Sequence, residues 1–129
     1  MHATSLDFKE IKDVLQSSVK KNRISGQAGS NDPLVEQARS ASSQLKAMAH
    51  ESRLAILFHL YEGAKSVSQL EALLDMRQPA VSQQLARLRS DQMVTTERRG
   101  KQVYYSISSK HAFVIVELLH RLYGNQVEQ

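Results

Sequence analysis

Apolar residues recur every three or four positions from residue 34 onward, and this spacing predicts a succession of helices. The first predicted helix covers residues 34–49. Asp32-Pro33, just before it, suits a helix cap and a first helical turn. The second helix, about residues 52–62, is strongly apolar, and we expect it to stop at Gly63 in a left-handed cap.

Two cap signals mark the next pair of helices. Ser66-x-x-Gln69 is a capping box, in which each side chain bonds the backbone N–H of the other residue, and it opens a third helix that runs through Leu74. Gln78-Pro79 opens the fourth, because proline is favoured in a first helical turn. A short helix, a turn and a second helix predict a helix-turn-helix. The apolar side of the fourth helix consists of Val81, Leu85 and Leu88.

A β-hairpin is predicted after the fourth helix. β-branched and aromatic residues alternate with polar ones over residues 93–98 and 102–107, on either side of the turn residue Gly100. The fold class is therefore mainly α with a β-hairpin wing, in the order of four helices, two strands and a fifth helix.

The last predicted helix, about residues 110–123, is capped by Ser108 or Ser109 and ends at Gly124. It is apolar nearly all round, so it must be buried on more than one side. In a domain this small, the second side is most simply another subunit.

Residues 1–33 are predicted to be an N-terminal extension, and residues 34–129 the main domain. A short helix of about residues 7–21 begins at the cap residue Asp7. A flexible linker of about residues 22–33 follows, rich in Gly, Ser and Asn. The amphipathic stripe of the short helix consists of Ile11, Val14, Leu15 and Val19.

Positive charge is concentrated in residues 77–101. This stretch holds six Lys and Arg residues and two acids, a net charge of +4, which equals the net charge of the whole chain. The other residues carry 11 basic and 11 acidic side chains and balance. Charge confined to one helix and one hairpin tip is typical of an element that binds DNA.

The second helix of a helix-turn-helix presents its N-terminal, outward side chains to the major groove. Gln can pair with adenine, Arg with guanine, and Ser with bases or phosphate. The basic hairpin tip suits the adjacent backbone or minor groove. The predicted DNA-binding residues are Arg77, Gln78, Pro79, Ala80, Ser82, Gln83, Gln84 and Arg87 on the helix, and Arg98, Arg99, Lys101 and Gln102 on the hairpin.

The chain resembles the ArsR/SmtB family of winged helix-turn-helix repressors over residues 34–123. The motifs that carry the resemblance are LKAMAHESRLAILFHL (45–60), QPAVSQQLARLR (78–89) and RRGKQVYYSI (98–107). The family patterns are an Ala-x-x-x-Arg-Leu-x-Ile-Leu helix entry, a Ser-Gln-x-Leu recognition helix and a Gly-x-x-x-Tyr-Tyr wing. The resemblance is greatest to members without metal and thiol sensor sites, similar to a nodulation repressor and to sulfide sensors lacking their cysteines.

The resemblance implies a homodimer built from the first and last main helices. Such a dimer binds an imperfect DNA palindrome near a promoter, represses by occluding it, and leaves when an inducer alters the dimer. The residues that we expect at the dimer interface are Leu34, Ala38, Ala41, Leu45, Phe113, Val116, Leu119, His120 and Tyr123.

The sensor sites of the family are missing from this sequence. The helix that carries a cysteine pair in metal sensors begins here with Ser66-Val67-Ser68-Gln69-Leu70. The two cysteines of the sulfide sensors fall at about Phe58 and Gly124. We therefore predict no metal and no cofactor, and the inducer is unknown. The zinc ligands of other members align with Ser109, His111, Leu122 and Asn125, of which only His111 suits a metal.

The histidines do not form a metal site within one subunit. His50 and His59 are nine residues apart, as are His111 and His120, so each pair lies on opposite helix faces. Solvated or hydrogen-bonded histidines are the favoured interpretation. A zinc site across the dimer, using His111 or His120, stays open as an alternative.

Several classes of function are excluded or disfavoured. The chain has no cysteine, which excludes disulfides and thiolate metal sites. It shows no secretory signal and no apolar run long enough to cross a bilayer, so we expect a cytoplasmic protein without membrane contact. No nucleophile–base pair or phosphate-binding loop is present, so we do not expect an enzyme. The alternative to a DNA-binding regulator is a protein-interaction module that docks through the N-terminal helix.

Overall fold

The computed structural model describes residues 32–124 together with residues 9, 12–13 and 16. The predicted helix of about residues 7–21, its apolar stripe and the linker of about residues 22–33 lie almost wholly outside the described residues. The four positions described within the predicted helix are helical and exposed. They are Lys9, Lys12, Asp13 and Gln16.

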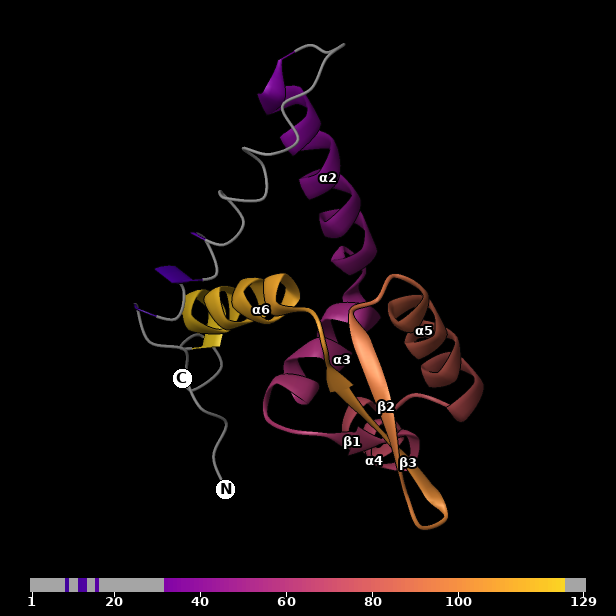
Figure 1. Ribbon diagram of the computed structural model, residues 1–129. Coiled ribbons are helices and arrows are strands. Elements are labelled where there is room, and N and C mark those ends of the chain that lie inside the picture. Colours follow the sequence, from indigo (N-terminus) through magenta and orange to yellow (C-terminus); the bar gives the residue numbers. More distant parts are fainter. Residues whose placement is uncertain (1–8, 10–11, 14–15, 17–31, 125–129) are drawn as a thin grey trace.

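The described chain contains the five predicted main helices, the predicted hairpin and one further short strand (Figure 1). In the part that the structure describes, no helix is long and apolar enough to span a membrane. The elements are α2 (Pro33–Met48), α3 (Glu51–Tyr61), β1 (Lys65–Ser66), α4 (Val67–Leu74), α5 (Gln78–Ser90), β2 (Val94–Arg99), β3 (Gln102–Ile107) and α6 (Lys110–Tyr123).

The predicted helix starts are confirmed. The Asp32 side chain accepts a hydrogen bond from the backbone N–H of Leu34 at 3.0 Å. Ser66 and Gln69 form both bonds of a capping box, at 3.2 Å and 2.8 Å. Ser109 caps α6, accepting a bond from Ala112. Each cap satisfies backbone donors that the first turn of a helix leaves without partners.

The predicted ends of α3 and α6 are confirmed, at Tyr61 and Tyr123, but the left-handed cap expected at Gly63 is wrong. Gly63 has φ 148°, a conformation that favours glycine but is not the left-handed helical one. Gly124 is right-handed, at φ −59° and ψ −36°, because its N–H still donates to the carbonyl oxygen of His120 and continues the helical pattern. Left-handed residues close two other helices: Asp75 caps α4 with φ 52° and ψ 47°, and Gln92 lies two residues after the end of α5 with φ 60°.

The hairpin belongs to a three-stranded antiparallel sheet in the order β1-β3-β2. Val94 pairs with Ile107 at one end of the hairpin and Arg99 with Gln102 at the other. The prediction missed β1, because two residues are too short to show an alternating pattern and Ser66 also serves as a helix cap. Since β1 pairs with β3 at Lys65 and Tyr105, it attaches the hairpin to the start of α4.

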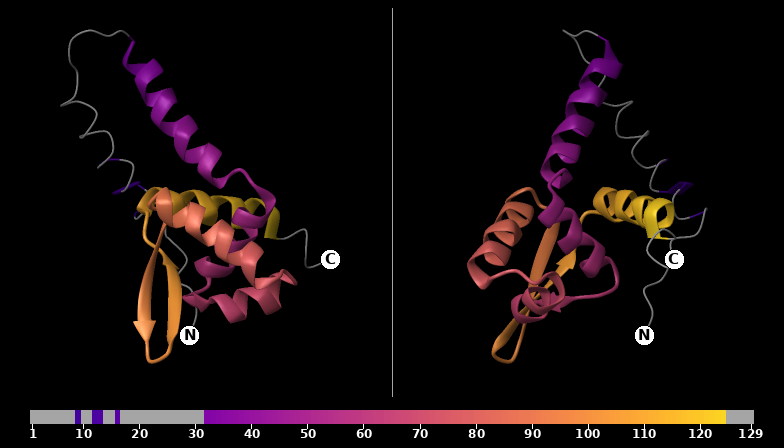
Figure 2. Two further views of the ribbon diagram at one scale, coloured as in Figure 1. Left: turned by 90° about the vertical axis from the view of Figure 1, so that its right-hand side faces the viewer. Right: turned by 180° about the vertical axis from the view of Figure 1, so that it is seen from behind.

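One hydrophobic core joins α3, α4, α5, the sheet and α6. Ile56, Leu70 and Leu85 are fully buried in it. α2 contributes only its last turn, through Ala47 and Met48, and the rest of this helix extends away from the domain (Figures 1 and 2). The core therefore fixes the helix-turn-helix and the hairpin as one unit, and most of α2 does not pack against the other elements that the structure describes.

Candidate nucleic-acid interface

The turn between α4 and α5 sets the direction of the second helix. Asp75 adopts the left-handed conformation, and the N–H of Met76 donates to the carbonyl oxygen of Glu71 at 3.3 Å. Arg77 is extended, at φ −77° and ψ 152°, and Pro79 stands in the first turn of α5. Asp and Asn enter the left-handed region more readily than other L-residues, so this turn can form without a glycine.

The two sides of α5 have opposite roles. Val81, Leu85 and Leu88 are all fully buried, as their spacing predicts. Gln83 is exposed, and it lies about 200° around the helix from Leu85, on the side facing away from the core. The helix therefore presents a polar face to solvent.

The start of α5 exposes further polar groups. Gln78 Nε2 donates to Ser82 Oγ at 2.6 Å, which holds these two side chains together across one helical turn. Arg77, Gln78 and Pro79 are exposed, whereas Ala80 and Ser82 are half-buried. The N-terminal half of the helix thus keeps the side chains that the sequence assigned to a DNA groove at or near the surface.

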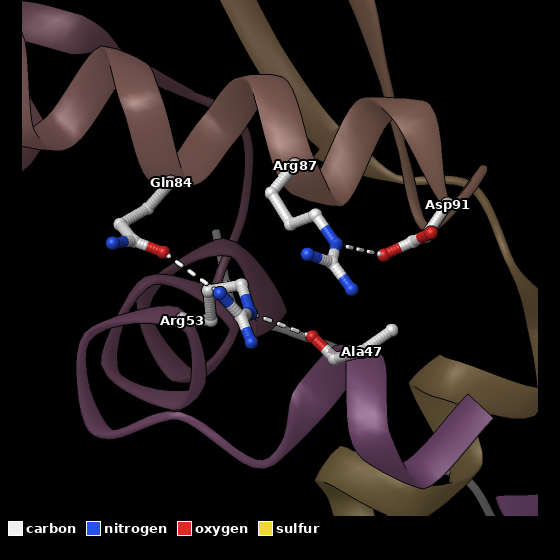
Figure 3. Close-up of polar contacts among 5 residues, drawn as sticks. All are labelled: Ala47, Arg53, Gln84, Arg87 and Asp91. Atoms are coloured by element: carbon white, nitrogen blue, oxygen red, sulfur yellow. Dashed lines mark hydrogen bonds and ion pairs between the residues drawn. The ribbon is translucent and has the colours of Figure 1, made fainter. Parts of the chain in front are cut away.

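Gln84 is tied to a residue that the sequence analysis did not select (Figure 3). Arg53, on α3, donates from Nη1 to Gln84 Oε1 at 3.0 Å and from Nε to the carbonyl oxygen of Ala47 at 2.7 Å. Arg53 stands in the Ala-x-x-x-Arg entry of α3, but its spacing shows no link to a helix 31 residues later. Only the fold brings these residues together.

Arg87 also has an internal partner. Its Nε donates to Asp91 Oδ2 at 2.9 Å, one turn later on α5 (Figure 3). The pair is exposed on the Arg87 side, so it contributes little to stability. The guanidinium keeps its Nη donors for another contact.

The cations of the hairpin tip lie on different faces of the hairpin. Arg99 pairs with Glu97 at 3.2 Å, and its guanidinium lies 4.8 Å from the centre of the Tyr104 ring. Arg98 is one position away in β2, so its side chain points to the opposite face. Gly100, at φ 65°, makes the tight turn. Arg98, Lys101 and Gln102 are exposed beside it.

The residues predicted at the dimer interface mostly lie at the surface of the protomer. Leu34 is 67% exposed, Leu45 52% and Tyr123 57%. Val116 is the exception: it is fully buried in the protomer's own core, so its placement at an interface was wrong. Its side chain points inward because it lies one turn after Ala112, which is also buried. The remaining members are Ala38, Ala41 and His120, which are exposed, and Phe113 and Leu119, which are half-buried.

The positions of the sensor cysteines hold a different arrangement. The Phe58 and His120 rings lie 6.4 Å apart, and a Cβ atom built at Gly124 would lie 3.7 Å from the same imidazole. The Tyr61 ring is 5.3 Å from that of His120. An imidazole among aromatic rings thus lies between the two positions. Among the residues that the structure describes, no three His, Asp or Glu side chains are grouped so as to hold a metal ion.

Comparisons with known proteins agree with this geometry. A family model described as "Bacterial regulatory protein, arsR family" matches residues 50–96, from the start of α3 into β2. The transcriptional activator HlyU of Vibrio cholerae is 47% identical over 79 residues, which cover 61% of this chain and 73% of that protein.

Two solved structures extend the likeness. The transcriptional repressor BigR from Xylella fastidiosa has a TM-score of 0.69 at 33% identity, covering 74% of this chain and 95% of that one. The homodimeric winged helix-turn-helix DNA-binding domain of Mb0332 from Mycobacterium bovis has a TM-score of 0.62 at 26% identity, covering 76% and 91%. The resemblance predicted from the motifs is confirmed: the chain belongs to the arsR family of bacterial regulatory proteins and has a winged helix-turn-helix fold.

Proposed function

We propose that this transcription regulator is a cytoplasmic, non-enzymatic homodimer that binds a palindromic operator and represses by occluding a promoter. One observation carries the proposal: a single protomer combines the exposed polar side of α5 with an exposed cationic hairpin tip. A helix of this kind suits the major groove, and cations beside it suit the flanking backbone.

Dimerisation is supported by two surfaces with apolar side chains exposed on the protomer. α2 exposes Leu34, Val35 and Leu45, and α6 exposes Leu118 and Leu122, all by half or more. Water contact on so many large apolar side chains is unfavourable, so a second copy of the chain gains free energy by covering them. A twofold dimer also supplies two recognition helices, which matches a palindrome whose half-sites lie about 34–36 Å apart.

Repression is the simplest direction of regulation for this chain. Among its relatives, HlyU is described as an activator and BigR as a repressor. Occlusion needs only the DNA interface, whereas activation also needs a surface that recruits the transcription machinery. A reporter gene behind the bound promoter tests the direction: expression should rise when the regulator is deleted, and a fall would show activation.

Selection of bound sequences from a random duplex pool tests the DNA interface. We expect an imperfect palindrome, and an affinity whose log–log dependence on salt has a slope of roughly −5 to −10 for the dimer. Gln83→Ala should lower the affinity for the selected site more than the affinity for unrelated DNA. An equal loss on both would count against base contacts by Gln83.

Lys101→Ala is the matched test of the hairpin tip. It should weaken binding to all sequences alike and make the salt slope less steep by about one for each phosphate that is no longer neutralised. Failure of the wild-type protein to enrich any sequence would contradict the proposal as a whole.

A further inference from the structure

The two neighbouring glutamines of α5 lie in different surroundings. Gln83 is exposed and faces away from the core. Gln84 is half-buried and lies three residues after Val81 and four before Leu88, so it stands at the edge of the buried side. When the outward face of a helix meets base edges in a groove, the edge of that helix faces the groove wall, which is made of phosphates.

Arg53 dictates which end of the Gln84 amide faces inward. A guanidinium has only donors, so the group that it contacts at 3.0 Å must be the carbonyl oxygen of Gln84. The amide nitrogen then points away from Arg53, as Figure 3 shows. Gln84 therefore offers donors outward, and its carbonyl oxygen is already engaged by Arg53. That arrangement is unsuited to the paired donor–acceptor contact with adenine that the sequence suggested.

The same contact favours an anion as the outward partner. A positive charge on the carbonyl oxygen polarises the amide, and linked hydrogen bonds strengthen one another. The N–H groups of Gln84 thus become better donors, with the positive end of the amide dipole directed outward. Arg53 itself is held by the carbonyl oxygen of Ala47 in the last turn of α2, so the orientation of Gln84 depends on that turn.

We infer that Arg53 is a positioning residue for DNA binding, which orients Gln84 to donate to a backbone phosphate at the groove wall. This inference rests on the proposed function. The two glutamines then have different roles: Gln83 contacts bases, and Gln84 binds the DNA phosphate backbone regardless of the base sequence.

The test compares Gln84→Met and Arg53→Met in the full chain, on the selected operator and on an unrelated duplex. A hydrogen bond to a charged phosphate, removed from both subunits, should weaken binding roughly 100- to 10,000-fold. The loss should be equal on both duplexes. The salt slope should not change in either variant, because Gln84 carries no charge and the Arg53 guanidinium contacts Gln84 and not a phosphate. Gln83→Met is the matched control, and it should weaken binding to the operator alone.

A double-mutant cycle separates positioning from a direct contact. If Arg53 acts through Gln84, then Arg53→Met should cost little further affinity in the Gln84→Met background. Thermal unfolding and sedimentation serve as controls that each variant folds and dimerises. Arg53→Lys serves as the second variant if Arg53→Met does not fold. It keeps the charge, so its salt slope should match wild type while affinity falls on both duplexes.

Three results would overturn the inference. The first is a Gln84→Met variant that loses affinity for the operator alone. The second is an Arg53→Met variant whose loss of affinity adds to that of Gln84→Met and whose salt slope is less steep, and the third is DNA affinity that neither substitution changes. If the wild-type protein binds no duplex at all, the result contradicts both the proposed function and the inference that rests on it. If the wild type binds DNA and the variants bind with the same affinity, only the inference is contradicted.

Discussion

Two regions of this molecule differ in how far their large apolar side chains are buried. The DNA-reading unit, formed by α4, α5 and the β2–β3 hairpin, buries most of its large apolar residues, among them Leu70, Leu85 and Leu88, and exposes Leu73. α2 and α6 leave Leu34, Leu45 and Leu122 more than half exposed. The first region is complete within one protomer, whereas the second gains its packing from another copy in the proposed dimer.

This contrast separates folding from assembly. Burial stabilises the DNA-reading unit before any partner is present, because its core is closed by α3, the sheet and one side of α6. The exposed faces of α2 and α6 contribute free energy only when they are covered. A regulator built in this way can alter its dimer without unfolding the helix that contacts DNA. The predictions below test this separation, beginning with the largest expected effect.

Truncation of a core residue in the DNA-reading unit should be the most destabilising change. Leu85→Ala removes a fully buried side chain and leaves a cavity, which costs about 2–5 kcal/mol of unfolding free energy. Urea unfolding measures the loss. Leu73→Ala, on the half-exposed residue of α4, is the control and should cost much less. Equal costs would show that the two sites are packed alike.

A charge on the exposed side of α6 should weaken dimerisation without unfolding the protomer. Leu122→Glu places a carboxylate where the proposed dimer buries an apolar side chain, and should raise the dimer dissociation constant by roughly two orders of magnitude. Sedimentation velocity measures this constant. Leu73→Glu adds the same charge at a similarly exposed leucine outside α2 and α6. If both variants dimerise like wild type, Leu122 is not at the interface.

Loss of the capping box should weaken the DNA-reading unit by a smaller amount. Ser66→Ala removes the acceptor for the Gln69 N–H at the start of α4 and should cost about 1 kcal/mol in thermal or urea unfolding. Ser43→Ala, at an exposed position within α2, should leave stability unchanged or slightly raised. A stability loss confined to Ser43→Ala would contradict the roles assigned to these two serines.

Relief of backbone strain should give the smallest effect of the four main changes, and this effect should be a gain in stability. Asp75→Gly places glycine at φ 52°, where an L-residue is strained, and should raise the unfolding free energy by about 0.5–1 kcal/mol. The matched variant Asp91→Gly, at φ −87°, relieves no strain and removes the partner of Arg87, so it should be neutral or destabilising. Destabilisation by Asp75→Gly would show that the aspartate side chain itself stabilises the turn.

Local chemistry made much of the fold predictable. Helix starts at Asp32, Ser66 and Ser109 depend on side chains that bond backbone groups two or three residues away, so they appear directly in the sequence. The buried side of α5 follows from helical spacing alone. The ends of α3 and α6 were also predicted next to glycines, but the backbone conformation there was not, because glycine permits a left-handed turn without requiring one, as Gly124 shows.

The sequence by itself determined the order of the helices, the hairpin, the excess of positive charge and the family motifs, since all of these depend on neighbouring residues. Only the tertiary structure decided that β1 joins the hairpin, that Val116 lies in the core and that Arg53 engages Gln84. These contacts join residues far apart in the chain, and spacing along one element carries no information about which other element will face it. For the same reason, the two neighbouring glutamines look equivalent in the sequence and differ in the fold.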